Sequence, residues 1–140
     1  MKRLKFFLIV SFLCYQGCFF GTGLIEQSLD NDFYLFANNS FDETSIIYNT
    51  GKYSSSIIVE ESVFAVGFND DFIIAKRHPK DSINQILEEI IYYYIIEINN
   101  ISKNNPKKSI PLSEEQYKSK RRELKIPNNL DFKIVIKEIE

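Results

Sequence analysis

The chain has 140 residues, with 17 Lys and Arg against 19 Asp and Glu, one His, two Cys and no Trp. This length fits one domain, and an apolar fraction of 44% is enough for a folded core, which excludes a wholly disordered chain. A net charge of −2 excludes the basic footprint of a nucleic-acid-binding protein, and so few Cys and His residues exclude both a Cys/His zinc site and a disulfide-rich scaffold. We therefore expect no nucleic acid as a partner, no bound metal and no cofactor.

The N-terminus has the order of a secretory signal peptide. Lys2, Arg3 and Lys5 form a positive cluster, and an almost wholly apolar run follows over residues 6–13. Even if it is extended to Phe20, this run is shorter than the roughly 20 residues that a transmembrane helix needs. An amphipathic or buried N-terminal helix is the alternative, but a charged cluster followed by an apolar block lacks the periodicity of a helix face.

Cys18 follows Gly17 directly after the apolar run. This arrangement resembles a bacterial lipoprotein precursor, in which a small residue precedes the Cys that is lipidated and becomes the first residue of the mature protein. The resemblance implies a signal peptide over residues 1–17 and attachment to a membrane of the bacterial cell envelope through a lipid on Cys18. The alternative is ordinary cleavage after residues 21–23, which would release a soluble secreted or periplasmic protein.

Loss of the signal peptide would change the charge of the protein. Residues 1–17 contain three basic residues and no acidic residue, so the net charge of the mature chain would fall to about −5. An acidic body is not attracted to anionic lipid by its own field. We therefore expect the membrane attachment to depend on the acyl chains.

Residues 18–31 are expected to form a tether, because Gly21 and Gly23 are followed by mostly polar residues, and a single domain is expected over residues 32–140. Short β-rich segments alternate with turn signals in the first half of this domain, which indicates an antiparallel meander. The expected strands cover residues 33–37, 45–48, 56–60, 62–68 and 72–77. The last two are expected to form a hairpin, and the apolar residues on both faces of 63–68 predict a central strand covered on each side.

Two helices and two further strands are expected in the second half. Ser82 and Gln85 have capping-box spacing and precede a stripe of apolar residues, which predicts a helix from Ser82 to about Ile90. Ser113 and Gln116 form a second capping box, which predicts a helix that ends before Pro127. Residues 91–98 have strong β propensity, and residues 132–137 alternate between apolar and charged as in an edge strand. The expected fold class is therefore α+β, a meander-like antiparallel sheet of about five to seven strands with two short helices.

Several stretches of the chain carry a further resemblance. They cover residues 63–70, 72–79, 92–98, 111–115 and 122–127. Together they are similar to a family of short bacterial lipoproteins that contain a domain of unknown function. The resemblance spans most of the mature chain, supports the lipoprotein and single-domain predictions, and implies no activity.

No catalytic signature is found, so we expect the protein not to be an enzyme. The only histidine, His78, is followed by Pro79 and is expected to be a polar residue at a strand end rather than a general base. Adjacent acidic pairs recur along the chain, as at Glu60 and Glu61. Adjacent acids point to opposite faces of a strand, so they are expected to be solvated surface rather than the facing carboxylates of a glycosidase.

Two groups of residues form the candidate binding surface. They are the basic cluster Lys76, Arg77, His78 and Lys80, and the tyrosines Tyr92, Tyr93 and Tyr94. In a strand Tyr93 opposes its two neighbours, so one side could present an exposed aromatic surface of the kind found at binding sites. The more ordinary alternatives are a charged strand end for the first group and core packing for the second.

The expected function is that of a non-catalytic envelope lipoprotein, a binding or structural module whose partner is an envelope protein. Anchoring to the membrane raises the effective concentration of such a module, so a modest affinity is sufficient. The alternatives are an inhibitor or immunity-type protein and a carboxylate-dependent envelope hydrolase. The sequence does not indicate the oligomeric state.

Overall fold

The computed structural model describes residues 23–30 and 32–140, in which the chain forms two antiparallel sheets and one α-helix. The strands are β1 (Ile25–Asp30), β2 (Phe33–Ala37), β3 (Ser45–Gly51), β4 (Ser54–Val59), β5 (Val63–Phe68), β6 (Phe72–Arg77), β7 (Tyr92–Glu97) and β8 (Ile134–Val135). The helix is α2 (Glu114–Glu123), and short 3-10 turns lie at Phe41–Glu43, Ile98–Asn100 and Lys137–Ile139. The predicted signal peptide and Cys18 lie outside the described residues.

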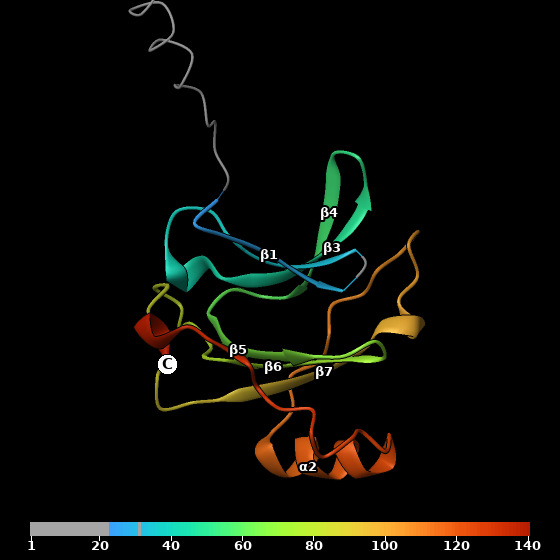
Figure 1. Ribbon diagram of the computed structural model, residues 1–140. Helices are drawn as coiled ribbons and strands as arrows, with labels where there is room; N and C mark the ends of the chain where they lie inside the picture. Colours follow the sequence, from blue (N-terminus) through green and yellow to red (C-terminus); the bar gives the residue numbers. More distant parts are fainter. Residues whose placement is uncertain (1–22, 31) are drawn as a thin grey trace, which may run out of the picture.

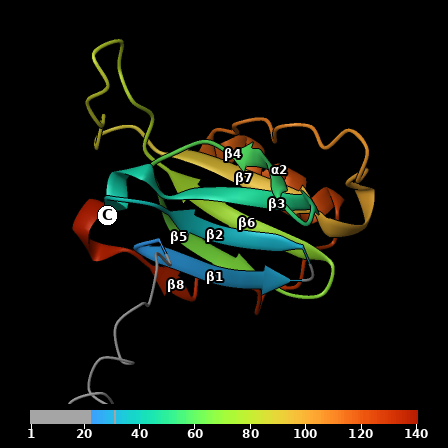
Figure 2. The same cartoon turned by 90° about the horizontal axis from the view of Figure 1, so that it is seen from above.

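The two sheets stack face to face, and α2 covers the outer face of the second sheet (Figure 1). The first sheet has the order β1-β2-β3-β4 and the second has the order β7-β6-β5-β8. Seen from above, the strands of the first sheet lie over those of the second (Figure 2). The chain is thus a three-layer structure in which sheet, sheet and helix follow one another.

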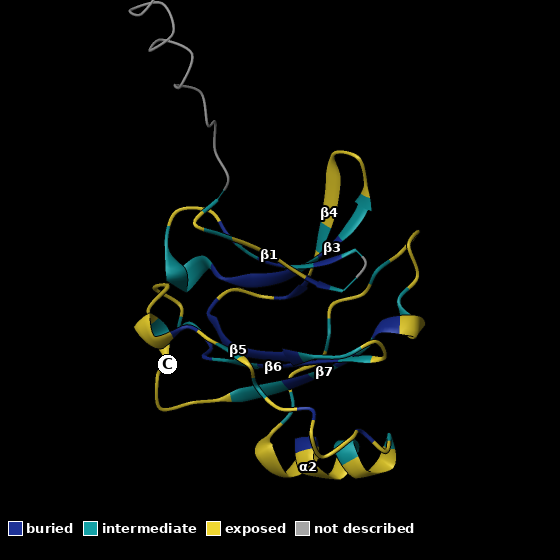
Figure 3. Ribbon diagram, in the orientation of Figure 1, coloured by how far each residue is buried: buried dark blue, intermediate teal, exposed yellow. Residues whose placement is uncertain are grey.

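The main core fills the space between the sheets, where the buried residues gather in Figure 3. Strand alternation directs Phe33 and Leu35 of β2 inward, and both are 1% exposed. They belong to one apolar cluster with Val66, Ile73 and other residues of the second sheet. Burial of this interface is the main source of stability for a domain of this kind.

A second, smaller core lies between the second sheet and α2. It contains Ile74, Tyr117, Ile126 and Leu130, all buried. Ile74 faces this core, whereas its neighbours Ile73 and Ala75 belong to the core between the sheets. The second sheet is therefore covered on both faces, and the prediction that residues 63–68 form a central strand covered on each side is confirmed.

The capping box of α2 is confirmed. The Ser113 hydroxyl accepts a hydrogen bond from the Gln116 amide at 3.2 Å, and the Gln116 side chain accepts one from the Ser113 amide at 2.8 Å. These bonds satisfy two of the amides that a helix N-terminus leaves free. None of the described helices is both long and apolar enough to cross a membrane.

The helix expected from Ser82 to about Ile90 is wrong. Asp81 precedes the predicted cap, and its carboxylate accepts hydrogen bonds from the amides of Ile83 and Gln85, each at 2.9 Å. Asn84 takes a left-handed conformation with φ of 66°, which a helix does not contain. Ile83 of the apolar stripe is 72% exposed, so the stripe lacks the packing partner that stabilises a short amphipathic helix.

The expected single sheet is also wrong, because the strands divide into two sheets of four. The chain leaves the first sheet at β4 and enters the second at β5, with Ser62 between them in a left-handed conformation with φ of 71°. Residues 25–30, expected in the tether, form β1, and the strand expected over 132–137 is reduced to β8. The fold class is therefore α+β and sheet-rich, with antiparallel strands as predicted but one described α-helix instead of two.

Candidate functional site

The basic cluster is held in ion pairs rather than presented as a free cationic surface. Lys80 Nζ lies 2.7 Å from the Glu61 carboxylate and 3.3 Å from that of Asp42, and its side chain is only 9% exposed. Arg77 donates from Nε to the Glu61 carbonyl at 2.6 Å, and its Nη2 lies 3.5 Å from the Glu60 carboxylate. The cluster therefore joins segments that are distant in sequence, and its role as a binding surface stays a prediction.

The charges of this cluster stabilise one another. Burial alone would lower the pKa of Lys80, but the hydrogen bond and charge of Glu61, together with Asp42, raise that pKa overall. A hydrogen bond from Ser40, aided by Lys80, lowers the pKa of Asp42. The hydrogen bond from Lys108 lowers the pKa of Glu60. The acids with lowered pKa values stay ionised at neutral pH, whereas a general acid needs a raised pKa.

His78 is buried, with 2% of its surface exposed. Its ring stacks on Phe64 at a centroid distance of 4.3 Å, and its Nδ1 lies 2.8 Å from the Ile90 carbonyl oxygen. Its Nε2 is buried and has no hydrogen-bond partner among the described residues. The histidine therefore packs in the interior and does not belong to a solvent-facing basic cluster.

The three tyrosines pack inward rather than forming an exposed aromatic surface. Tyr94 is 2% exposed in the core between the sheets, and its hydroxyl accepts a hydrogen bond from Arg77 at 3.2 Å. Tyr93 points to the other face and stacks on Tyr117 at 4.9 Å, while Tyr92 is half-buried against the core between the sheets. The predicted alternation is confirmed, and these contacts agree with the ordinary alternative of core packing. Lys76 also lies over an aromatic ring, 4.7 Å from the centre of Phe132.

The structure instead forms an apolar pocket of about 360 Å³ beside β7. We call it the β7 pocket. Most of its lining is apolar, and three lysines, one glutamate and two small polar residues also line it. The lining residues are Ile58, Ile95, Ile96, Ile101, Ile110, Leu112 and Leu124, with Lys107, Lys108, Lys120, Glu97, Asn100 and Ser109. A concave, mainly apolar site with a few polar groups is the usual form of a ligand site.

The β7 pocket forms where the segment that follows β7 turns back along the sheet edge. At one end Leu112 and Tyr93 exchange backbone hydrogen bonds of 2.8 and 3.0 Å. At the other end the Ser109 amide donates to the Ile58 carbonyl of β4 at 2.8 Å. Ile110 between these two attachments lines the pocket, and the α2 side contributes Lys120 and Leu124.

The backbone of β7 faces this opening. β7 is the first strand in the order of its sheet, so none of the described strands pairs with its other edge. Tyr93 uses its amide and carbonyl groups for Leu112, away from β6. Because the direction of these groups alternates along an antiparallel strand, Ile95 and Glu97 direct theirs to the same edge. The Ser109 hydroxyl donates to the Ile95 carbonyl at 3.4 Å.

Three lysines and one glutamate line the β7 pocket, and two of the lysines are in ion pairs with acids beside it. Lys108 pairs with Glu60 at 2.7 Å and Lys120 pairs with Glu123 at 2.8 Å, and both lysines remain partly exposed. Lys107 has no ion pair among the described residues. Ile110 is 75% exposed beside them. The pocket is therefore suited to an apolar group that carries a negative charge close by.

Sequence reasoning did not find the β7 pocket, because its lining comes from β4, β7, the following segment and α2. The one local signal is Ile110, an apolar residue that closes a polar loop after two lysines. No group of three or more His, Cys, Asp or Glu residues in the described part of the chain is placed to hold a metal ion.

Comparison with known proteins gives one family. The family model with the description "Protein of unknown function (DUF3997)" matches residues 30–140, which is more than half of the chain. This match confirms the resemblance to a family with a domain of unknown function. No curated protein and no solved structure matches the chain.

Proposed function

The chain belongs to the family DUF3997, and we propose that it is a non-catalytic binding module of the bacterial cell envelope. The observation that carries this proposal is the β7 pocket. It has a volume of about 360 Å³, a mainly apolar lining, and three lysines and one glutamate among its lining residues. Pockets of roughly 300–1,000 Å³ with this composition are typical ligand sites. A binding function needs no catalytic residues in the pocket.

The proposed ligand is a segment of an envelope protein that presents a large apolar side chain next to a carboxylate. The apolar side chain would occupy the pocket, and the carboxylate would face Lys107 and its neighbouring lysines. The Ile95 amide and the backbone groups of Glu97 face the edge of β7 away from β6 and support an extended ligand, because an extended segment can pair with a strand edge. Charge complementarity of this kind favours specificity and a fast association rate.

The proposed location depends on the lipid anchor. Cys18 would carry several acyl chains. Several chains anchor a protein stably, whereas a single chain gives only marginal membrane binding. An anchored module meets a neighbouring envelope component at high effective concentration. A modest affinity of the β7 pocket for its ligand is then sufficient for function.

Lipidation is tested by the mass of the mature protein. We expect a mass that corresponds to a chain beginning at Cys18 with acyl chains attached, and we expect globomycin to cause the uncleaved precursor to accumulate. A mature chain that begins at Leu24 and has no lipid would contradict the anchor.

The β7 pocket is tested by changing its exposed residues. Ile110→Asp is expected to reduce recovery of the partner from crosslinked envelopes by at least about tenfold, because one buried aliphatic side chain contributes about 1.5–3 kcal/mol. Lys107→Glu is expected to reduce recovery to a similar extent, because it places a negative charge beside the carboxylate of the ligand. Both residues are exposed, so neither change should disturb the fold. Ile83→Asp is the matched control, since Ile83 is 72% exposed and lies outside the pocket. Equal recovery with all three variants would refute the pocket as the site.

The identity of the partner separates the remaining alternatives. An inhibitor or immunity-type protein would recover a hydrolase or a toxin through the same pocket. A carboxylate-dependent hydrolase is the less favoured alternative. Asp42 and Glu61, from different segments, do converge, but they converge on Lys80 as ion-pair partners.

A further inference from the structure

We propose that the tip of the β3–β4 hairpin contacts the membrane surface and forms a second attachment beside the lipid on Cys18. The tip consists of Lys52 and Tyr53. This inference rests on the lipid anchor of the proposed function but not on the β7 pocket. It assigns the hairpin a lipid surface as its partner.

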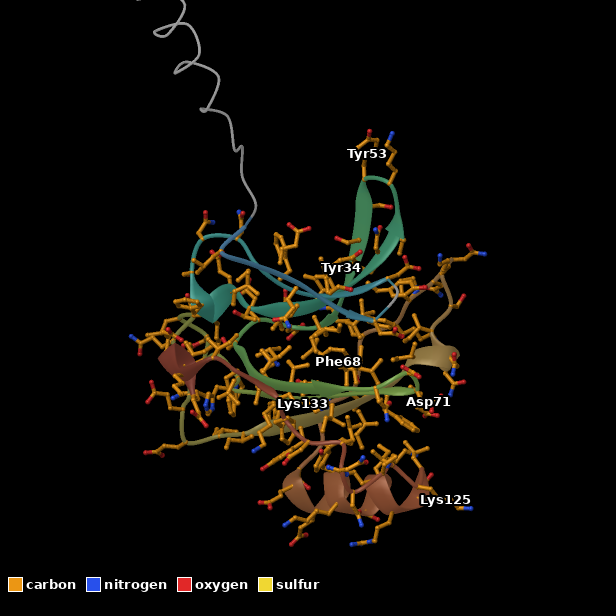
Figure 4. All side chains as sticks on the ribbon, in the orientation of Figure 1. Tyr34, Tyr53, Phe68, Asp71, Lys125 and Lys133 are labelled. Atoms are coloured by element: carbon orange, nitrogen blue, oxygen red, sulfur yellow. The ribbon has the colours of Figure 1, made fainter. Side chains whose placement is uncertain are left out.

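The hairpin rises beyond the body of the first sheet, on the side away from α2 (Figure 1). Tyr53 stands at its end and points into solvent (Figure 4). Its side chain is 90% exposed, and Lys52 Nζ lies 5.2 Å from the centre of its ring. An aromatic ring in this position contributes nothing to either core, so its role is sought outside the domain.

Side-chain hydrogen bonds support the tip. The Thr50 hydroxyl donates to the Ser54 hydroxyl at 2.8 Å, and the Gly51 amide donates to the Asn49 side chain at 3.1 Å. The backbone register continues to Gly51 opposite Ser54. The register shifts between Asn49 and Gly51, and the hydrogen bonds of Thr50 and Gly51 hold the turn that presents Tyr53.

The anchor holds this side of the domain near the bilayer. Only residues 19–24 separate Cys18 from β1, and a fully extended chain of this length spans at most about 25 Å. β1 belongs to the first sheet, the same layer from which the hairpin rises (Figure 1). Glu26 of β1 lines the same hollow as Lys52 and Tyr53, so the chain enters the domain on the side that carries the tip.

The chemistry of the tip fits the membrane–water interface. A tyrosine places an apolar ring at the level of the lipid headgroups and keeps its hydroxyl hydrated, and a lysine is attracted to anionic headgroups. Residues 49–56 contain one lysine and no acidic residue, whereas the body is acidic. Among the described residues, Glu26 is the one acid that lines the hollow between the tip and the first sheet.

A tryptophan at the tip provides the test, because the chain has none. The full mature lipoprotein carrying Tyr53→Trp is placed in vesicles of zwitterionic lipid, with or without anionic lipid, and with brominated acyl chains as quenchers. Trp emission is expected to shift to the blue and to be quenched several-fold more than in the matched variant Ile83→Trp. Adding Lys52→Glu is expected to reduce this quenching in the anionic vesicles only.

The outcomes are distinct. Equal quenching of the two variants in acylated protein would overturn this inference and leave the β7 pocket proposal intact. A protein whose mass shows no acyl chains would overturn both the anchor and the contact. A change in tip emission caused by soluble envelope glycan, without any response to vesicles, would assign the hairpin to sugar binding instead.

Discussion

Replacing Gly67 by Ala is expected to destabilise the domain by at least about 3 kcal/mol. Gly67 lies in β5 where the C-terminal segment crosses the sheet. A Cβ at this position would overlap the carbonyl oxygen of Asp131 and would lie 2.8 Å from its carbonyl carbon. Because both are backbone atoms, no side-chain rotation relieves the overlap, and the segment must move away. Urea denaturation measures the loss.

The displaced segment gives this prediction a local readout. The Lys133 amide donates to Val66 at 3.0 Å and the Ile136 amide donates to Phe64 at 2.7 Å. Both amides should lose protection from hydrogen exchange in Gly67→Ala. Gly51→Ala is the control, because a Cβ there would meet only the Ser54 hydroxyl, at 3.2 Å. If Gly67→Ala unfolds at the same urea concentration as Gly51→Ala, the crossing of β5 by this segment is refuted.

Phe33→Ala is expected to lower the free energy of unfolding by about 3–5 kcal/mol. Phe33 is 1% exposed between the sheets, and its ring lies 4.8 Å from that of Tyr48. Truncation removes apolar contacts and leaves a cavity that the two stacked sheets cannot readily close. The loss is a large part of the roughly 5–15 kcal/mol that stabilises an ordinary domain.

Tyr53→Ala is the matched aromatic truncation, and it is expected to change the free energy of unfolding by no more than about 0.5 kcal/mol. Tyr53 is 90% exposed at the hairpin tip, so no core contact is lost. Urea midpoints of the two variants decide the matter. Similar losses from both truncations would contradict a core between two sheets with a free hairpin tip.

Short sequence patterns correctly predicted the elements whose hydrogen bonds join residues close together in the chain. The Ser113–Gln116 capping box predicted α2, because all of its hydrogen bonds lie within four residues. The same spacing at Ser82 and Gln85 did not produce a helix, since the Asp81 side chain binds the amides first. The capping-box spacing therefore predicted a helix correctly only where no neighbouring side chain bound the same backbone amides.

Non-local contacts account for what the sequence did not predict. The turn signals predicted most strands but could not divide them between two sheets, because that division depends on contacts across the core. Ile25 and Leu29 of β1 pack on the core between the sheets, but they are four residues apart and lie among polar residues that resemble a tether. The acids that neutralise Lys80 lie 38 and 19 residues away. The order of charged residues in the sequence therefore could not show whether Lys80 is paired with acids or exposed as a free charge.

The proposed ligand of the β7 pocket is an apolar, acidic segment of an envelope partner. A photoreactive amino acid placed at Ile110 in the full chain, in intact cells, tests it most directly, with the same substitution at Ile83 as the control. We expect an adduct from position 110 alone, a crosslinked peptide with a large apolar residue beside Asp or Glu, and loss of the adduct with Lys107→Glu and Lys120→Glu together. The same adducts from both positions, or none from position 110, would contradict the account.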